Sequence, residues 1–280
     1  MPSYSYGFCY KQQYNQSFDL ITSCSFDGGF DQVSSFTAVE GITSYKYDGT
    51  MIDYGARYAE KVELQITMVK KNYTPLSLQE KRKILAWLTS SKQCSWLTLY
   101  DEHGEEVVDF YGRFNHVEEK IADSRVIGLI ATFVSPYPYG FSPLRQIKQS
   151  FYGKEKLTIQ NDSDVLDDYV RPYIAVKLNR NVDVLTIANH TTNTIVYVKN
   201  IKSGETITLD CENKLAFSND SYRKMGSDFY GNINGYTTNY PVFVEFSPGD
   251  NEIEIDTGNS LCKCEYTIQY RYPVKAGSTF

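Results

Sequence analysis

The chain has 280 residues, a formal net charge of −6 and 22% charged residues. This length predicts two domains of about 140 residues each. The negative charge argues against nucleic acid as a main partner, because phosphate binding requires clustered Lys and Arg. No apolar run approaches the ~20 residues of a membrane span, and the first residues lack a signal-peptide pattern. We therefore expect no specific nucleic-acid binding, no membrane binding, and folding in a cytoplasm.

Residues 44–60 form the first informative segment, with short aromatic stretches on either side of the turn signal Asp48-Gly49. The pattern predicts a hairpin that either protrudes as an arm or packs on its own domain. An exposed hairpin of this kind is an aggregation hazard unless a neighbouring subunit covers it. The candidate contacts between subunits are its tyrosines, Tyr45, Tyr47, Tyr54 and Tyr58.

A strand and the most clearly marked helix follow the hairpin. Residues 62–68 alternate strictly between apolar and polar side chains, which predicts a half-buried strand. Ser77 and Glu80 have the spacing of a capping box, and residues 81–90 carry an apolar stripe with the spacing of a helix. The sequence therefore predicts a helix over residues 81–90.

The rest of the first half predicts a hairpin and a central strand. The hairpin has its two predicted strands at residues 96–100 and 107–113, with a turn at Gly104 between them. Residues 126–134 are apolar at nearly every position, which predicts a strand inside the sheet.

Residues 135–143 mark the end of the first domain. Three prolines within eight residues remove backbone donors and disfavour helical geometry in the residues before them. We therefore predict a first domain over residues 1–140, a linker over 141–154 and a second domain over 155–280.

The second half predicts many short strands and no convincing helix. The expected strands lie at residues 156–160, 172–178, 182–188, 194–198, 206–209, 241–246, 252–255 and 264–272. A turn at residues 248–251 separates two of them. A spacing near ten residues is typical of a β-sandwich of the jelly-roll or lectin-like type. The fold class is therefore mainly β, with one α-helix in the first domain.

Motifs for catalysis or cofactor binding are absent from the sequence. His103, His116 and His190 have no partner at metal-ligand spacing, and no nucleotide-binding or hydrolase signature occurs. Cys262 and Cys264 resemble half of a metal site, but buried strand thiols are the favoured interpretation. The acidic residues at 162–168 favour a solvated linker over a calcium site. We expect no metal, no cofactor and no enzymatic activity.

The order of elements resembles a known family. The features that carry the resemblance are the helix ending in residues 83–88, the hairpin of residues 96–113, and a strand running into Ser-Pro-Tyr-Pro-Tyr-Gly at 135–140. Together they are similar to the tail-component domain of siphovirus-type phages, and the whole chain resembles a distal tail protein. The turn at residues 248–253 is similar to one near the end of that family's second domain, whereas residues 8–18 depart from the family pattern.

The resemblance implies a structural role. It implies a ring-forming β-sandwich-like first domain and a galectin-like second domain, assembled as a hexameric ring at the tail tip or baseplate of the virion. The implied partners are other copies of the chain, the tail tube protein, a tail-associated lysin or hub protein, and a receptor-binding protein. In this interpretation residues 44–60 are the arm by which neighbouring subunits hold one another.

Two alternatives remain. In the first, the second half is a carbohydrate-binding module that contacts the host cell wall. Its candidate saccharide contacts lie in a Gly- and Asn-rich stretch with several aromatic residues, and they are Tyr222, Tyr230 and Tyr236. The second alternative, a cell-wall glycosidase, is the least favoured because no catalytic signature appears.

Overall fold

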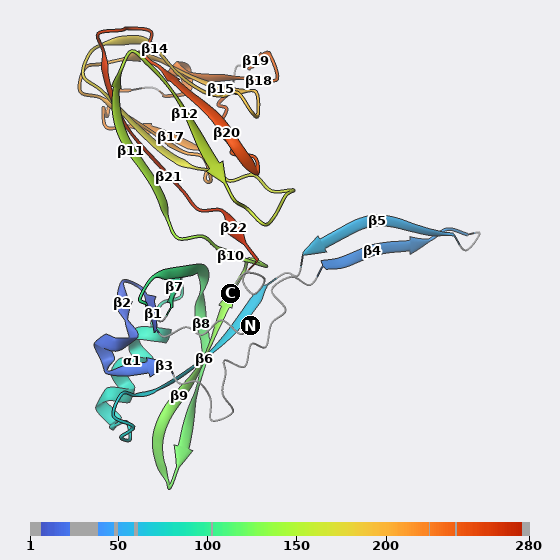
Figure 1. The fold of residues 1–280 in the computed structure, drawn as a ribbon, viewed down its shortest axis with the longest axis vertical. Coiled ribbons are helices and arrows are strands. Elements are labelled where there is room, and N and C mark those ends of the chain that lie inside the picture. Colours follow the sequence, from blue (N-terminus) through green and yellow to red (C-terminus); the bar gives the residue numbers. More distant parts are fainter. Residues whose placement is uncertain are drawn as a thin grey trace. The chain divides into compact units, whose positions relative to one another are not determined.

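The structure is a computed structural model (Figure 1) that describes residues 7–22, 39–47, 50–58, 61–101, 103–223, 225–238 and 240–275. The chain divides into two compact units. Unit 1 contains Met1–Pro143 with Val274–Phe280, and unit 2 contains Leu144–Pro273. The mainly-β prediction is confirmed, since strands dominate both units. No helix in the described ranges is long and apolar enough to cross a membrane.

Unit 1 is built from a bent antiparallel sheet and one long helix. The strand order is β2-β1-β7-β8-β9-β6-β3, and the short strands β10 and β22 pair with each other, β10 also with β8. The elements are β1 (Gly7–Tyr10), β2 (Gln13–Tyr14), the 3-10 helix η1 (Asn15–Phe18), β3 (Leu20–Thr22), β4 (Val39–Tyr45), β5 (Met51–Tyr58), β6 (Val62–Lys70), α1 (Leu78–Thr89), β7 (Ser95–Tyr100), β8 (Glu106–Ala122), β9 (Arg125–Ser135), β10 (Gly140–Phe141) and β22 (Pro273–Val274).

Strand β8 joins the two parts of this sheet. Its first half pairs with β7 as far as Gly112, and its second half, from Arg113, pairs with β9. The register shifts between Phe114 and His116, and such a bulge bends a strand and increases its twist. The strand predicted at 107–113 is thus real but continues to Ala122. The sequence prediction stopped early because charged residues such as Glu118 and Glu119 interrupt the apolar pattern.

The predicted helix and its capping box are confirmed. Ser77 Oγ accepts a hydrogen bond from the Glu80 amide at 3.3 Å, and the Ser77 amide donates to Glu80 Oε2 at 2.8 Å. Glu80 Oε1 also accepts from Lys70 Nζ at 2.8 Å, which ties the helix to the end of β6. The buried face of α1 presents Ile84, Trp87 and Leu88 to the core of unit 1.

Trp87 anchors the helix to the start of the chain. Its ring stacks on Phe8 at 5.4 Å between centroids and on Phe18 at 4.5 Å. Its indole N–H donates to the carbonyl of Tyr10 at 3.0 Å. The segment that departs from the family pattern in sequence, residues 8–18, therefore supplies core residues of unit 1.

Unit 2 is a two-sheet β-sandwich. One sheet has the order β11-β21-β13-β16-β17 and the other β12-β20-β14-β15-β18-β19. The elements are β11 (Arg145–Tyr152), β12 (Lys154–Asn161), β13 (Tyr173–Leu178), β14 (Val182–Asn189), β15 (Thr194–Ile201), β16 (Thr206–Asp210), β17 (Leu215–Ser218), the one-turn helix α2 (Met225–Asp228), β18 (Phe229–Ile233), β19 (Tyr236–Thr238), β20 (Gly249–Asp256) and β21 (Lys263–Tyr270). The predicted alternation of β21 is confirmed, because Cys264, Tyr266, Ile268 and Tyr270 are all buried.

Two expectations for unit 2 are wrong. The predicted linker at 141–154 contains β11, an edge strand that pairs with β21 over eight residues. Residues 241–246 do not form a strand, although Val242, Val244 and Phe246 are buried. Only Phe246 makes a bridge, to Val170. The carbonyls of Glu245 and Phe246 accept hydrogen bonds from asparagine side chains, at 2.7 and 3.1 Å, in place of a continuous ladder.

Candidate functional site

The predicted hairpin at 44–60 exists as a two-stranded sheet. Strands β4 and β5 pair with each other and with no other strand in the described ranges. The register aligns Val39 with Tyr58 and Tyr45 with Met51, with an irregularity between Gly41 and Thr43. Beyond the last pair, the Lys46 amide donates to the Thr50 carbonyl at 2.8 Å. An isolated two-stranded hairpin in water is only marginally stable by itself.

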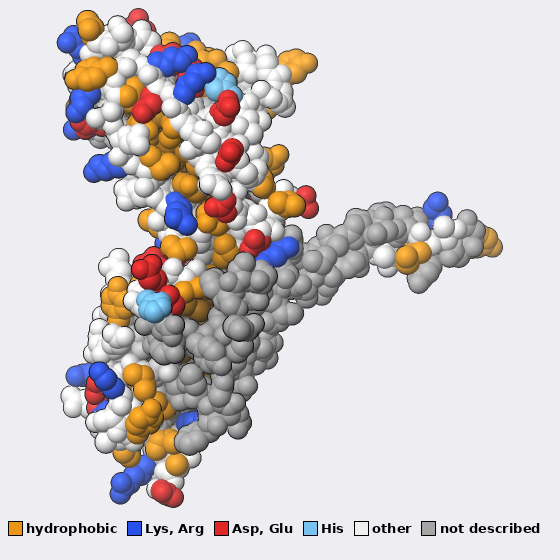
Figure 2. Space-filling view, in the orientation of Figure 1, with side chains coloured by type: hydrophobic (Ala, Val, Ile, Leu, Met, Phe, Trp, Pro, Cys, Tyr) orange, Lys and Arg blue, Asp and Glu red, His pale blue; other side chains and the backbone are white. Residues whose placement is uncertain are grey.

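The described side chains at the end of the hairpin are exposed. Tyr47 has a relative exposure of 110%, and Met51 is also exposed. Figure 2 shows these hydrophobic side chains, with a cationic one beside them, at the end of the hairpin. Of the other predicted contact residues, Tyr45 lies on β4, and Tyr54 and Tyr58 lie on β5. Their side chains, and the turn residues Asp48 and Gly49, lie outside the described residues.

A cluster of aromatic rings covers the face of β7 and β8 that points away from α1. Trp96 packs on Tyr111 at 5.1 Å and meets Phe141 edge-on at 5.4 Å. Phe141 is also edge-on to Tyr137 and Tyr139, at 5.1 and 5.4 Å. The proline-rich segment therefore does more than end a strand, because its rings form a half-buried aromatic cluster with Trp96 and Tyr111.

The three candidate saccharide contacts are not brought together. Tyr222 lies in the loop after β17 and is 88% exposed, and Tyr236 begins β19 and is 79% exposed. Tyr230 lies on β18, where it stacks on Tyr197 at 4.9 Å. Lys199 Nζ stands 4.4 Å from the centre of the Tyr230 ring. No ring contact joins the three tyrosines in the part of the chain that the structure describes.

The loop that presents Tyr222 is held by a buried ion pair. Arg223 donates to both carboxylate oxygens of Glu205, and the two side chains are only 4% and 2% exposed. Arg223 also donates to Asp228 Oδ2 at 3.2 Å and to the backbone carbonyls of Lys199 and Asn200. The loop is thus attached to β15, to α2 and to the turn that precedes β16. No local sequence pattern identifies this network, because its members are brought together only by the fold.

Two histidines, Cys262 and Cys264 make ordinary structural contacts. His116 lies 3.1 Å from Glu118, and His190 lies 3.3 Å from Glu254, which also pairs with Lys154 at 2.6 Å. Cys262 and Cys264 are buried free thiols, as predicted, and burial raises the pKa of Cys264 to about 12. Within the described ranges, no three His, Cys, Asp or Glu side chains gather as metal ligands.

Comparison with known protein families shows which family the chain belongs to. Residues 3–135 match the model of a phage tail protein N-terminal domain, and residues 139–270 match that of a phage tail C-terminal domain. The chain belongs to the phage tail proteins. The two matches meet at the proline-rich segment that follows β9. No curated protein matches this tail protein in sequence.

Comparison with solved structures adds a likeness of fold to one tail protein. The crystal structure of SPP1 Dit (gp 19.1), described as a paradigm of the hub adsorption apparatus in phages that infect Gram-positive bacteria, is similar with a TM-score of 0.60 and 10% identity. The match covers 96% of this chain and 98% of Dit. The activated baseplate of phage P2 with Ca gives a TM-score of 0.40 at 10% identity, over 88% of this chain and 94% of that one. The predicted resemblance to a distal tail protein is confirmed for family and fold.

Proposed function

We propose that this tail protein is a non-enzymatic ring component at the distal end of the tail. Six copies close into a hexamer that connects the tail tube to the baseplate and the host-adsorption proteins. The observation that supports this function best is the likeness to SPP1 Dit over nearly the full length of both chains.

The β4–β5 hairpin is the proposed contact between neighbouring copies. A heterologous contact, in which the arm of one copy lies on a different surface of the next, generates a ring when the rotation closes. Closure then covers every arm, including the exposed Tyr47. Tyr45, Tyr54 and Tyr58 are the further proposed contacts. This arrangement explains how a self-paired hairpin with exposed apolar side chains is kept from aggregating.

The proposed partners follow from the position at the tail tip. They are the tail tube protein on one side, a tail-associated lysin or hub protein on the other, and a receptor-binding protein at the periphery. The protein is assembled in the host cytoplasm and ends in the virion. The net charge of −6 suits a ring whose channel DNA must pass without being held.

The oligomeric state of an arm-less variant tests this function. Residues 39–58 are replaced by a short Gly-Ser linker, and light scattering coupled to size exclusion gives the mass of each protein. We expect the full chain to form a hexamer and the arm-less variant to elute as a folded monomer. A hexamer that persists without the arm would refute the role of the hairpin, and a full chain that stays monomeric at every concentration would refute self-assembly of the ring.

A further inference from the structure

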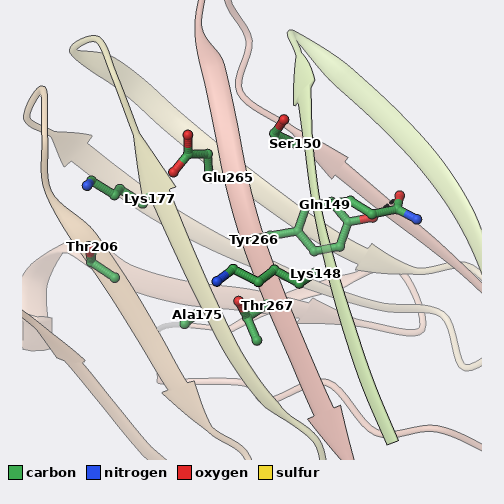
Figure 3. A pocket seen from close by; sticks show the side chains of 9 residues that line it. All are labelled: Lys148, Gln149, Ser150, Ala175, Lys177, Thr206, Glu265, Tyr266 and Thr267. Atoms are coloured by element: carbon green, nitrogen blue, oxygen red, sulfur yellow. Dashed lines mark hydrogen bonds between the residues drawn. The ribbon is translucent and has the colours of Figure 1, made fainter.

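The outer face of the five-stranded sheet in unit 2 contains a groove that the tail-hub function does not use. The groove has a volume of about 600 Å³ and is lined from four strands, β11, β13, β16 and β21. Figure 3 shows Lys148, Thr267 and Ala175 close together, while Tyr266 and Gln149 extend together to one side. From this groove we infer that unit 2 binds an acidic glycan, a saccharide or polyol chain that carries carboxylate or phosphate groups.

Strand register explains why a groove forms here. Lys148 pairs with Thr267, Thr267 with Ala175, and Ala175 with Thr208, so these residues form one row across the sheet. The next row places Ser150, Glu265, Lys177 and Thr206 side by side. Because side chains alternate between faces, both rows lie opposite the buried row that contains Tyr266 and Val176. In the first row the small side chains of Thr267 and Ala175 leave the floor low, and Lys148 stands at one end of that row. In the next row Glu265 and Lys177 stand in the middle.

The charge of the groove favours an anionic ligand. Neither Lys148 nor Lys177 pairs with a carboxylate in the described ranges. Glu265, the acidic residue of the lining, is engaged by Lys263 Nζ at 2.7 Å. The hydrogen bond from Lys263 is the main reason that the pKa of Glu265 is lowered, and the charges of Lys177 and Lys148 act in the same direction. Two lysines of the lining therefore stand beside one carboxylate that Lys263 already engages, in a chain whose net charge is −6.

The other groups in and beside the groove suit a glycan better than an acidic peptide. Ser150, Thr206 and Thr267 supply hydroxyls that can donate to and accept from sugar hydroxyls. Tyr173 and Phe217 are exposed, and their register places them on the same face of the sheet, where they offer flat apolar surfaces to sugar rings. Peptide-binding grooves generally rely on apolar pockets for side chains or on a free sheet edge, whereas this groove lies across the face of paired strands.

Binding by the full-length protein tests the inference. The probes are oligogalacturonate, which carries carboxylates, and poly(glycerol phosphate), with neutral dextran and poly-glutamate for comparison. The test variant is the double change Lys148→Gln and Lys177→Gln. The matched control is Lys156→Gln with Lys199→Gln, which removes the same charge from the opposite sheet and includes the lysine above Tyr230.

We expect at least one of the two acidic glycans to bind, with an affinity that falls as salt is raised. The double change in the groove lowers the affinity by roughly tenfold or more, because one hydrogen bond to a charged group contributes a binding free energy of that size. The control pair changes binding less than about twofold. Three results would overturn the inference. Neither acidic glycan binds, or both double variants lose the same amount of affinity for the acidic glycan. In the third result, poly-glutamate binds as tightly as the glycan through the same lysines. None of them depends on whether the ring forms.

Discussion

Arg223 and Glu205 form a bidentate ion pair that is almost completely buried under the loop carrying Tyr222. Glu205 also accepts hydrogen bonds from Ser218 Oγ at 2.5 Å and from the Lys202 amide at 2.8 Å. Burial alone would raise the pKa of Glu205, but the hydrogen bonds from Arg223, Ser218 and Lys202 outweigh it and the pKa is lowered. The pair therefore holds together the turn before β16, the end of β17 and the loop.

Removal of the arginine is expected to destabilise unit 2. Arg223→Met leaves the Glu205 carboxylate buried without its main partner, which costs about 3 kcal/mol of unfolding free energy. Urea unfolding followed by circular dichroism measures the loss. Lys202→Met is the control, because it breaks the exposed pair with Asp220 and should change stability little. If both substitutions lowered the free energy of unfolding equally, the buried pair would contribute no more to stability than the surface pair.

The helix cap of unit 1 is expected to lose its stabilising effect in acid. Hydrogen bonds from Lys70 and Ser77 lower the pKa of Glu80 to about 2 from its ordinary value of 4.5. A carboxyl group with a lowered pKa stabilises the fold above its unfolded pKa, and that contribution disappears as the pH falls through its folded pKa. We expect wild type to exceed Glu80→Gln in stability at pH 6, and the difference to vanish as the pH falls from about 4.5 to about 2. A difference that stays constant between these pH values would contradict this role.

The half-buried aromatic cluster on β7 and β8 is expected to contribute to stability. Phe141→Ala removes ring contacts with Trp96, Tyr137 and Tyr139, and we expect a loss of about 2 kcal/mol for this half-buried ring. The change should also make Trp96 more accessible to a fluorescence quencher, and Trp87, at 7% exposure, should be unaffected. Phe217→Ala serves as the control because Phe217 lies in unit 2, whereas both tryptophans of the chain, Trp87 and Trp96, lie in unit 1. Unchanged quenching in Phe141→Ala would contradict the packing described for Trp96.

The hairpin end is expected to affect assembly and not folding. Tyr47 is fully exposed, so Tyr47→Ser should change unfolding free energy by less than about 0.5 kcal/mol. If a neighbouring copy buries Tyr47, the same change weakens ring assembly on the scale of an interface hot spot, about 2 kcal/mol. Tyr152→Ser is the matched control, an exposed tyrosine in unit 2. Sedimentation of the three proteins over a range of concentrations distinguishes these expectations.

The sequence predicted those elements whose signals are local. The capping box and the apolar stripe define α1, and strict alternation defines β6 and β21. Strand β11 was missed because it lies at a sheet edge, where only Ile147 and Phe151 are half-buried and the other side chains are exposed. Its residues therefore look like a polar linker.

Contacts between distant segments could not be predicted from the sequence. Arg223 meets Glu205 and Trp96 meets Phe141 only after the sheets have formed. The groove is equally invisible in sequence, since it depends on a register that aligns small side chains on three strands and lysines beside them.

Mass photometry of the purified full-length protein, combined with negative-stain class averages, tests the proposed ring most directly. The account predicts a discrete species of six times 32.1 kDa with a central hole and six-fold symmetry. A protein that remains monomeric at every concentration, or that forms open chains without a closed ring, would contradict it.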